Sequence, residues 1–314
     1  MIYSNNFMPA ISIILPAYNA EQTIKESIES ILNQDFTDFE LLIINDGSND
    51  NTQKIIESYK DSRIKLINNE KNYGLIYSLN KGLDNASGKY IARMDADDIS
   101  MPHRLKRQFD FMEANPEVIV CGSKIRYFGQ KKFIPPFKAP KTDYECKQYM
   151  IYGSCFAHPT TIIRKSILDN YNIKYDDNFY NCEDYKLWLD LMEYGKFYNL
   201  QQILLKYRIS AQQITQNYNL KQIKNSQICR RIYLKNVLGI HSIEKEITIE
   251  TIRTLRYIRK ENKYIIPTLY LSLNTYSINI FKEFLFSKDF LYCNIHDICR
   301  IAKRFIKGKQ HPLI

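Results

Sequence analysis

The feature that most constrains the fold is an alternation, from Ile11 to about Gly122, between short apolar runs and longer amphipathic stretches. Short apolar runs suit strands that are buried on both faces, and amphipathic stretches suit helices that cover a sheet. This order predicts β-α-β units and an α/β fold with a mostly parallel sheet. The expected strands are residues 11–15, 39–44, 64–67, 90–94 and 118–121.

Two of the crossovers between these strands carry an apolar stripe at helical spacing. The residues that form the two stripes are Ile24, Ile28, Ile31 and Leu32 in one, and Leu75, Leu79 and Leu83 in the other. Both stretches are therefore predicted to be helices that pack on the sheet. After residue 122 the alternation fades, a second mixed region spans residues 143–210, and the chain beyond 216 is predicted to be mainly helical.

Three polar clusters follow the first, second and fourth predicted strands. In an open sheet of this kind, ligands bind beyond the carboxyl ends of the strands. The clusters are therefore expected to meet at one edge and to form a ligand site. They are Pro16-Ala17-Tyr18-Asn19, Asn45-Asp46-Gly47-Ser48 and Asp95-Ala96-Asp97-Asp98.

The overall composition favours a globular protein inside the cell. With 314 residues, 45% of them hydrophobic, the chain has enough apolar material for one large domain and an appendage. Residues 1–9 lack the basic and apolar parts of a signal peptide. The seven cysteines are scattered and form no CxxC pair, which favours reduced thiols over a disulfide framework or a zinc site. The weakly polar stretch 264–281 is a poor membrane span because its polar groups would need partners in lipid.

The third cluster places three carboxylates within four residues at the end of a strand. Mg²⁺ and Mn²⁺ prefer oxygen ligands and are commonly held by one or two carboxylates together with substrate phosphates. A metal site is one interpretation. The other is an acidic turn that caps a helix from Pro102, with Asp98 or Ser100 as its N-cap.

Other polar residues are ambiguous when taken singly. Asp46, followed by Gly47, could accept hydrogen bonds from a base or ribose, or could belong to a simple turn. Glu183 and Asp184 open an amphipathic helix in which Leu187, Leu191 and Tyr194 are expected to face inward beside Trp188. Acidic residues favour the first turn of a helix, so spacing alone does not make this pair a general base. His158 and Arg208 are weaker signals, although an arginine in the position of Arg208 could reach a diphosphate.

The order of the clusters resembles glycosyltransferase family 2, whose Rossmann-like fold is called GT-A. Five blocks carry the resemblance, which covers about residues 10–215: ISIILPAYNA (11–20), SILNQ (30–34), ELLIINDGS (40–48), NYGL (72–75) and ARMDADD (92–98). EDYKLW (183–188) resembles the block of the family that carries the base. The blocks GLIYSLNKGL (74–83), YIARMDADDI (90–99) and KYR (206–208) look most like bacterial lipooligosaccharide β-1,3-N-acetylhexosaminyltransferases, which use UDP-sugars and invert the anomeric centre.

The resemblance implies a donor site and a base. Asp46 would hold the base or ribose, Asp95 the ribose side, and Asp97 an Mn²⁺ or Mg²⁺ ion. Asp184 would be the general base with Glu183 beside it. The remaining residues assigned to the nucleotide-sugar are Pro16, Ala17, Tyr18, Asn19, Arg93, Ala96 and Arg208. Many relatives have His two residues after the Tyr-Arg pair, where this chain has Ser210, so the roles at that end of the site carry over less directly.

The region 216–314 has a balance of +11, with 18 Lys and Arg against 7 Asp and Glu, so the rest of the chain is close to neutral and the net charge of +10 comes from this region. Near its end, apolar residues recur at helical spacing while Arg and Lys occupy the other faces. A basic amphipathic helix of this kind either lies on an anionic membrane surface or packs on the catalytic domain. Membrane association would place the enzyme on the inner face of the cytoplasmic membrane, next to a lipid-linked acceptor. The apolar stripe is Ile298, Ile301, Ala302, Phe305 and Ile306.

Three other functions compete with this interpretation. A nucleotidyltransferase would be expected to show a Gly-rich phosphate loop near the first strand, and the cluster that begins at Pro16 has none. A nucleic-acid-binding protein would account for the basic tail, but no recognised binding motif accompanies it. A catalytically silent partner in glycan assembly would not need the carboxylates that this chain carries. An inverting glycosyltransferase with a surface-glycan acceptor is the favoured prediction.

Overall fold

The protein is described by a computed structural model that covers residues 8–129, 137–150, 153–209 and 220–238. The chain divides into two compact units, residues 1–226 and 227–314. The first unit contains all of the strands described below. Ser210 and the predicted amphipathic helix around Ile298 lie outside the described residues. The boundary expected near residue 215 stays a prediction.

The predicted parallel half of the sheet is confirmed. Strand β2 pairs in parallel with β1 and β3, and β1 pairs in parallel with β4. Their residues are almost entirely buried in β1, β2 and β4, as expected for strands covered on both faces. The strands are β1 (Ile11–Ala17), β2 (Phe39–Asn45), β3 (Ile64–Asn68) and β4 (Tyr90–Arg93).

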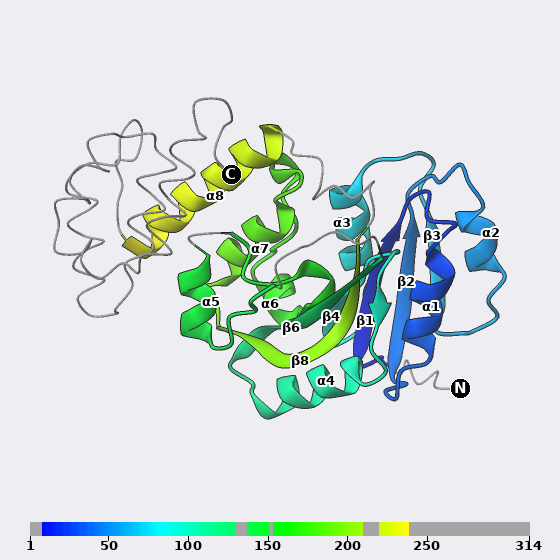
Figure 1. Cartoon of the computed structure of the whole chain (residues 1–314), viewed down its shortest axis with the longest axis horizontal. Coiled ribbons are helices and arrows are strands. Elements are labelled where there is room, and N and C mark those ends of the chain that lie inside the picture. The colour runs from blue at the N-terminus through cyan, green and yellow to red at the C-terminus, as the bar shows by residue number, and fades with distance from the viewer. Residues whose placement is uncertain (1–7, 130–136, 151–152, 210–219, 239–314) are drawn as a thin grey trace, which may run out of the picture. The chain divides into compact units, whose positions relative to one another are not determined.

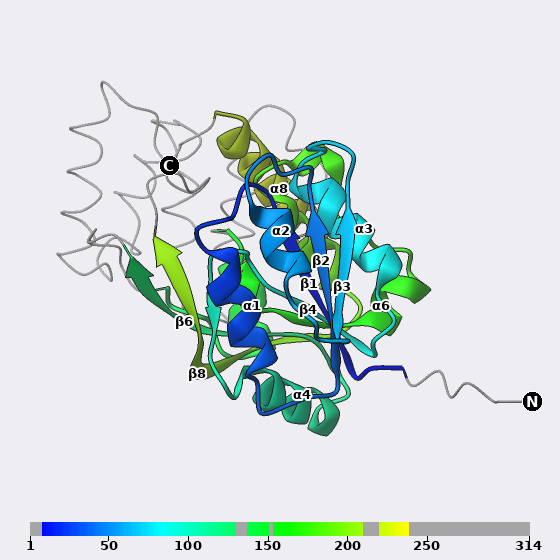
Figure 2. The same ribbon diagram turned by 90° about the vertical axis from the view of Figure 1, so that its right-hand side faces the viewer.

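Helices cover both faces of these strands. Alternate residues of β1, such as Ile11 and Ile13, join Ile28 of α1 (Ile24–Leu32) in one apolar cluster. Ile14 points the other way, against Gly82 of α3 (Leu75–Asn85). Figure 2 shows the two layers, with α1 and α2 (Thr52–Glu57) on one side and α3 on the other. Both predicted helices are confirmed, although the buried face of α3 centres on Ile76, Leu79 and Gly82, and of its three predicted leucines only Leu79 is fully buried.

The rest of the sheet was not predicted beyond the start of β6. The full strand order is β3-β2-β1-β4-β7-β6-β8-β5 (Figure 1). The short β7 (Ile162–Arg164) pairs antiparallel with both β4 and β6 (Val118–Gly129). The long β8 (Lys196–Ile209) runs beside β6 and pairs antiparallel with β5 (Ile99–Ser100). This last pairing brings the end of β8 next to the acidic cluster that follows β4.

The remaining described helices lie in the second half of the chain or lead into it. They are α4 (Arg104–Ala114), α5 (Asp143–Tyr149), α6 (Lys165–Asn170), α7 (Glu183–Leu191) and α8 (Leu220–Leu238), with single turns η1 (His158–Thr160) and η2 (Asp177–Phe179). None of the helices in the described parts of the chain is long and apolar enough to cross a membrane. The cysteines in those parts are buried: Cys121, Cys146, Cys155, Cys182 and Cys229.

Two local predictions were wrong. The helix expected from Pro102 begins at Arg104, and its N-cap residue is His103, not Asp98 or Ser100. The amide of Ser100 instead donates to Ser30 Oγ, because the segment before α4 forms strand β5. Tyr194 does not face inward with Leu187 and Leu191: α7 ends at Leu191, and the Tyr194 side chain is exposed.

Candidate active site

The first two polar clusters meet as predicted. The amide of Asn19 donates to Ser48 Oγ at 3.0 Å, and the amide of Asn49 donates to Asn19 Oδ1 at 2.9 Å. Asn19 has a φ of +48°, a left-handed conformation that asparagine adopts more readily than most residues. The backbone at Ala17 is tied to the second cluster by the amide of Asp46, while the ring of Tyr18 is exposed next to it.

Asp46 is buried and organises the loop that leads into α3. Its carboxylate accepts hydrogen bonds from Asn69 Nδ2 (2.7 Å) and from the amides of Tyr73 (3.0 Å) and Gly74 (2.8 Å). The adjacent Gly47 has a φ of +66°, and a Cβ there would lie 2.4 Å from the backbone of Lys71. In the structure the Asp46 carboxylate fixes the loop that leads into α3. A nucleotide contact by Asp46 stays a prediction.

The third cluster brings three carboxylates together. Oxygens of Asp95, Asp97 and Asp98 lie within 4.8 Å of one another. Asp98 is only 1% exposed: its Oδ1 accepts the amide hydrogen of Arg208 at 2.8 Å, and its Oδ2 has no hydrogen-bond partner among the described residues. Burial, together with the charges of Asp95 and Asp97, raises the pKa of Asp98 well above its usual range. The cluster therefore carries more negative charge than its protein surroundings satisfy.

A divalent cation fits this cluster. Hard cations such as Mg²⁺ and Mn²⁺ take oxygen ligands, and a buried carboxylate oxygen without a donor is a costly group that a cation would stabilise. Asp97 is the predicted ligand, and Asp95 lies beside it within the same cluster. The alternative that Asp98 caps a helix is excluded by the position of α4.

Three arginines surround the cluster. Arg93 is buried and forms an ion pair with Asp95. Arg104, also buried, donates to the carbonyl of Arg93 at 2.7 Å, and its burial lowers its pKa to about 9. Arg208 donates to the carbonyl of Asp97 at 2.6 Å, forms an ion pair with Glu26 and lies over the ring of Phe128. In the structure the Arg208 guanidinium is held by these protein contacts next to the predicted metal ligand.

Glu183 and Asp184 form the first turn of α7. The Asp184 carboxylate accepts the amide hydrogen of Tyr185 at 2.7 Å and is hydrogen-bonded by Ser154, whose Oγ also accepts from Trp188 Nε1 at 3.0 Å. Burial raises the pKa of both Glu183 and Asp184, and the charge of Asp184 adds to the rise at Glu183. A carboxylate with a raised pKa is a better proton acceptor near neutral pH than an ordinary one.

Arg93 lies between the two acidic groups. Its positive charge lowers the pKa of Asp98 and also of Glu183 and Asp184, while the charge of Asp95 raises that of Glu183. The two groups are 85 residues or more apart in sequence and yet share one electrostatic environment. A cation-binding cluster and a proton-accepting pair in one site suit the transfer of a group from a phosphate ester to a hydroxyl.

Comparison with known proteins identifies the chemistry. The sequence profile of the family described as Glycosyl transferase family 2 matches residues 12–171, which is just over half of the chain. The chain belongs to glycosyltransferase family 2. The matched range contains all three polar clusters that follow strands of the sheet. The relatives described below are glycosyltransferases, which does not support the competing nucleotidyltransferase and nucleic-acid-binding interpretations.

Curated relatives of this family-2 glycosyltransferase extend the match over nearly the whole chain. An uncharacterised glycosyltransferase of Haemophilus influenzae is 33% identical over 95% of this chain and 97% of its own length. The Escherichia coli protein WfgD, described as a UDP-Glc:α-D-GlcNAc-diphosphoundecaprenol β-1,3-glucosyltransferase, is 34% identical over 73% of this chain and 88% of its own.

A solved structure confirms the predicted GT-A fold. The Staphylococcus aureus protein TarS (residues 1–349), crystallised with UDP-GlcNAc, matches with a TM-score of 0.59 over 95% of this chain and 92% of that one. Its sequence identity is 17%, so the similarity concerns the fold alone. It supports the architecture that places the polar clusters at the carboxyl edge of the sheet.

Several residues of this family-2 site escaped the sequence analysis. Ser27 Oγ donates to the carbonyl of Asp95 at 2.9 Å, and Ser154 holds Asp184. His158 Nε2 lies 2.8 Å from Tyr175 Oη, and burial and the charge of Arg93 lower the pKa of this histidine well below its usual range. His158, which is a weak signal in the sequence, is thus a buried histidine whose neutral form is favoured. A single serine or tyrosine within a mixed region gives no sequence signal for these contacts.

Proposed function

We propose that this glycosyltransferase transfers a hexose or N-acetylhexosamine from a UDP-sugar to a hydroxyl of a surface-glycan acceptor, with inversion at the anomeric carbon. The observation that carries the proposal is that the Asp95-Asp97-Asp98 cluster and the Glu183-Asp184 pair are both close enough to Arg93 for its charge to act on each of them. One group suits a metal-bound diphosphate and the other suits proton removal. Both are needed for a single displacement.

The donor would bind at the edge formed by the polar strand ends. The ring of Tyr18 is exposed there, next to the backbone of Pro16, Ala17 and Asn19, and is available to stack on a base. Asp46 would contact the base or ribose, and Asp95, with Ala96 beside it, the ribose side. A UDP donor is supported by the UDP-sugar named for the Escherichia coli relative.

The acidic cluster would hold Mn²⁺ or Mg²⁺ through Asp97. A cation bound there would neutralise the charge that develops on the departing diphosphate. Arg93 contributes a buried Nε that has no hydrogen-bond partner among the described residues, and so offers a donor to an anionic ligand. Arg208 would reach the diphosphate by leaving its ion pair with Glu26.

The reaction would couple proton transfer from the acceptor hydroxyl to nucleophilic substitution at the anomeric carbon. The Asp184 carboxylate takes the proton of the acceptor hydroxyl, and the acceptor oxygen forms a bond to the anomeric carbon. The bond from that carbon to the diphosphate oxygen breaks with its electron pair, so that UDP leaves from the opposite face. Glu183, which is buried beside Asp184, would keep the base apart from water and contact the donor or acceptor.

The acceptor would be a lipid-linked glycan at the inner face of the cytoplasmic membrane. The relative that is named as acting on GlcNAc-diphosphoundecaprenol supports this class of acceptor. The excess of Lys and Arg in residues 216–314 supports attraction to an anionic surface, and we propose no nucleic acid as a partner. Co-sedimentation with anionic vesicles should fall after truncation at Asp297, and binding that survives this truncation would contradict the predicted role of the terminal helix.

The function is tested by UDP release from a panel of UDP-sugars, with Mn²⁺ or EDTA. We expect slow, metal-dependent hydrolysis of one donor, lost in Asp97→Ala and Asp184→Asn. Asp190→Asn is a matched control, because Asp190 lies on the same helix as Asp184 but pairs with Lys186 at 2.7 Å. Release from no donor, together with no UDP binding by calorimetry, would favour a catalytically silent partner in glycan assembly.

A further inference from the structure

The loop that leads into α7 is held by side chains from the start of α8. Asn225 Nδ2 donates to the carbonyls of Asn178 (3.2 Å) and Tyr180 (3.1 Å). Gln222 Nε2 donates to the carbonyl of Asn181 at 3.1 Å. All of these residues belong to the first compact unit. Three carbonyls within four residues therefore receive their donors from two amide side chains more than 40 positions away.

A further hydrogen bond between the loop and α8 runs in the opposite direction. The Cys182 thiol donates to the carbonyl of Gln222 at 3.7 Å, so residues on both sides of the junction donate to the other. Asn225 is 5% exposed. The loop is more open to solvent than Asn225, since Asn178 and Tyr180 are exposed and Asn181 is half-buried. The amides of Gln222 and Asn225 therefore take the place of water as donors and link this loop to α8.

The start of α7 lacks the local devices that usually fix a helix N-terminus. Its N-cap residue, Cys182, makes no side-chain capping hydrogen bond. Asn181, directly before it, has a φ of +62°, which is a conformation that few residues adopt without support. The approach of the chain to α7 therefore combines a local turn, in which the amide of Cys182 donates to the carbonyl of Phe179 at 2.8 Å, with the donors that α8 supplies. Glu183 and Asp184 are the first two residues after this junction.

We infer that Gln222 and Asn225 are positioning residues that set the place of the Glu183-Asp184 pair relative to the donor site. The inference rests on the proposed function, in which Asp184 accepts the acceptor proton. A displacement of a reacting group by about 1 Å can cost on the order of a hundredfold in rate. The start of α8 thus belongs to the catalytic machinery, although it lies beyond residue 215, where the family resemblance ends.

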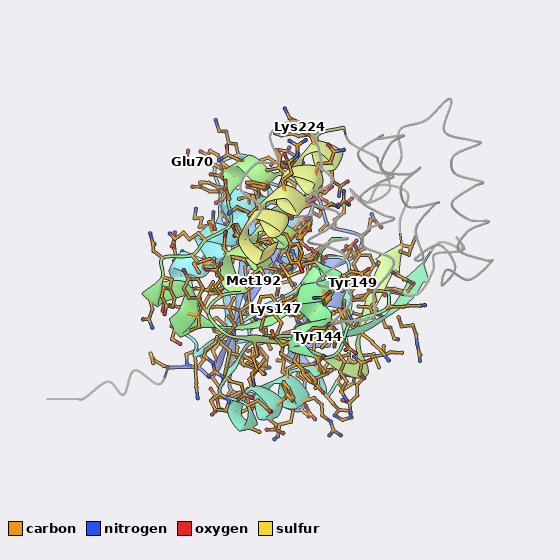
Figure 3. The ribbon with its side chains drawn as sticks, turned by 90° about the vertical axis from the view of Figure 1, so that its left-hand side faces the viewer. Glu70, Tyr144, Lys147, Tyr149, Met192 and Lys224 are labelled. Atoms are coloured by element: carbon orange, nitrogen blue, oxygen red, sulfur yellow. The ribbon has the colours of Figure 1, made fainter. Side chains whose placement is uncertain are left out.

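The test uses the full chain with Asn225→Ala, Asn225→Asp and Gln222→Ala. Asn225→Asp keeps the size of the side chain but removes its N–H donors. We expect kcat to fall by about tenfold to a hundredfold in the two Asn225 variants and less in Gln222→Ala, with the KM for the donor within about twofold of wild type. Lys224→Ala is the matched control, since Lys224 is an exposed residue between the two on the same helix (Figure 3).

Amide hydrogen exchange separates positioning from a general loss of stability. In Asn225→Ala, exchange should become faster in residues 179–186 and stay unchanged in β1 and β2. Unchanged exchange at 179–186, an unchanged kcat, or faster exchange throughout the first unit would each overturn the inference. The exchange result does not depend on catalysis. If wild type released UDP from no donor, the proposed function would fail while the local exchange effect in Asn225→Ala would still be observed.

Discussion

The two acidic groups of the site differ in the protein groups that stabilise their negative charge. In the Asp95-Asp97-Asp98 cluster, the carboxylates lie within 4.8 Å of one another and are balanced by the ion pair to Arg93. Among the described residues, Glu183 and Asp184 form no ion pair; the Asp184 carboxylate accepts the amide hydrogen of Tyr185, and the hydroxyl of Ser154 lowers its pKa. The arrangement of the first group suits the binding of a cation, and that of the second suits the acceptance of a proton.

The difference assigns separate steps to the two groups. Three carboxylates whose oxygens lie within 4.8 Å of one another suit a cation, whereas a buried pair with raised pKa values suits proton uptake from a hydroxyl. Arg93 couples them, because its charge lowers the pKa on both sides. If the division is correct, substitutions in one group should leave the task of the other intact.

The largest effect is expected from Asp184→Asn. Loss of a general base costs about a hundredfold to ten-thousandfold in rate, while the amide keeps the size of the side chain. We expect kcat for transfer to fall within that range, with UDP and Mn²⁺ binding by calorimetry unchanged. Weakened metal binding in this variant would break the proposed division, and Asp190→Asn should behave as wild type.

Removal of the predicted metal ligand comes next. Asp97→Asn should weaken Mn²⁺ binding and lower kcat by at least about a hundredfold, because charge stabilisation by the cation contributes several kcal/mol. Excess Mn²⁺ should restore part of the activity, which it should not do for Asp184→Asn. The control is Asp110→Asn, since Asp110 is an exposed carboxylate paired with Lys106 at 2.5 Å on α4. Full activity of Asp97→Asn in EDTA would contradict metal dependence.

The pH dependence distinguishes the two groups in the wild-type enzyme. The base must be ionised, and burial raises the pKa of both Glu183 and Asp184. The rate should therefore fall as the pH drops through this raised pKa, at a higher pH than an ordinary carboxylate would give. A profile of kcat against pH at saturating Mn²⁺ measures this limb. A limb that stays near the usual carboxylate range would argue against this pair as the base.

The smallest effect concerns the ion pair between Arg208 and Glu26. If Arg208 leaves Glu26 to contact the diphosphate, Glu26→Gln should strengthen donor binding, because the competing partner is gone. Exposed ion pairs contribute up to about 1 kcal/mol, so we expect up to about a fivefold lower Kd for UDP. An unchanged Kd would indicate that Arg208 acts through Asp97 and Asp98 instead of binding the donor.

The parallel half of the fold could be predicted because its strands are apolar throughout. Runs such as Leu41 to Ile44 lie in a sheet covered on both faces, and Ile24, Ile28 and Ile31 mark the helix that covers it. β7 could not be predicted in the same way. It is three residues long, and its antiparallel pairing to β4 depends on a partner about 70 residues away.

Site residues that belong to a sequence motif could be predicted, whereas residues whose role depends on contacts with distant parts of the chain could not. Asp97 and Asp184 stand in recognisable blocks. For Asp98, the sequence left a helix cap open as an alternative to a metal site. Nothing in the sequence shows that β5 pairs with β8 and brings the amide of Arg208 to the Asp98 carboxylate. Asn225 gave no signal for a similar reason, since its amide serves carbonyls of a loop 45 or more residues earlier.

The junction between α7 and α8 also bears on how such enzymes diversify. Recombination can exchange the C-terminal regions of two relatives. The loop before α7 then keeps its hydrogen bonds only if the breakpoint falls after Gln222 and Asn225. A crossover near residue 215 would separate Asn225 from the carbonyls of Asn178 and Tyr180, whereas one after Ser226 would keep them together. Chimaeras joined after Ser226 would thus keep the hydrogen bonds that hold the loop before α7.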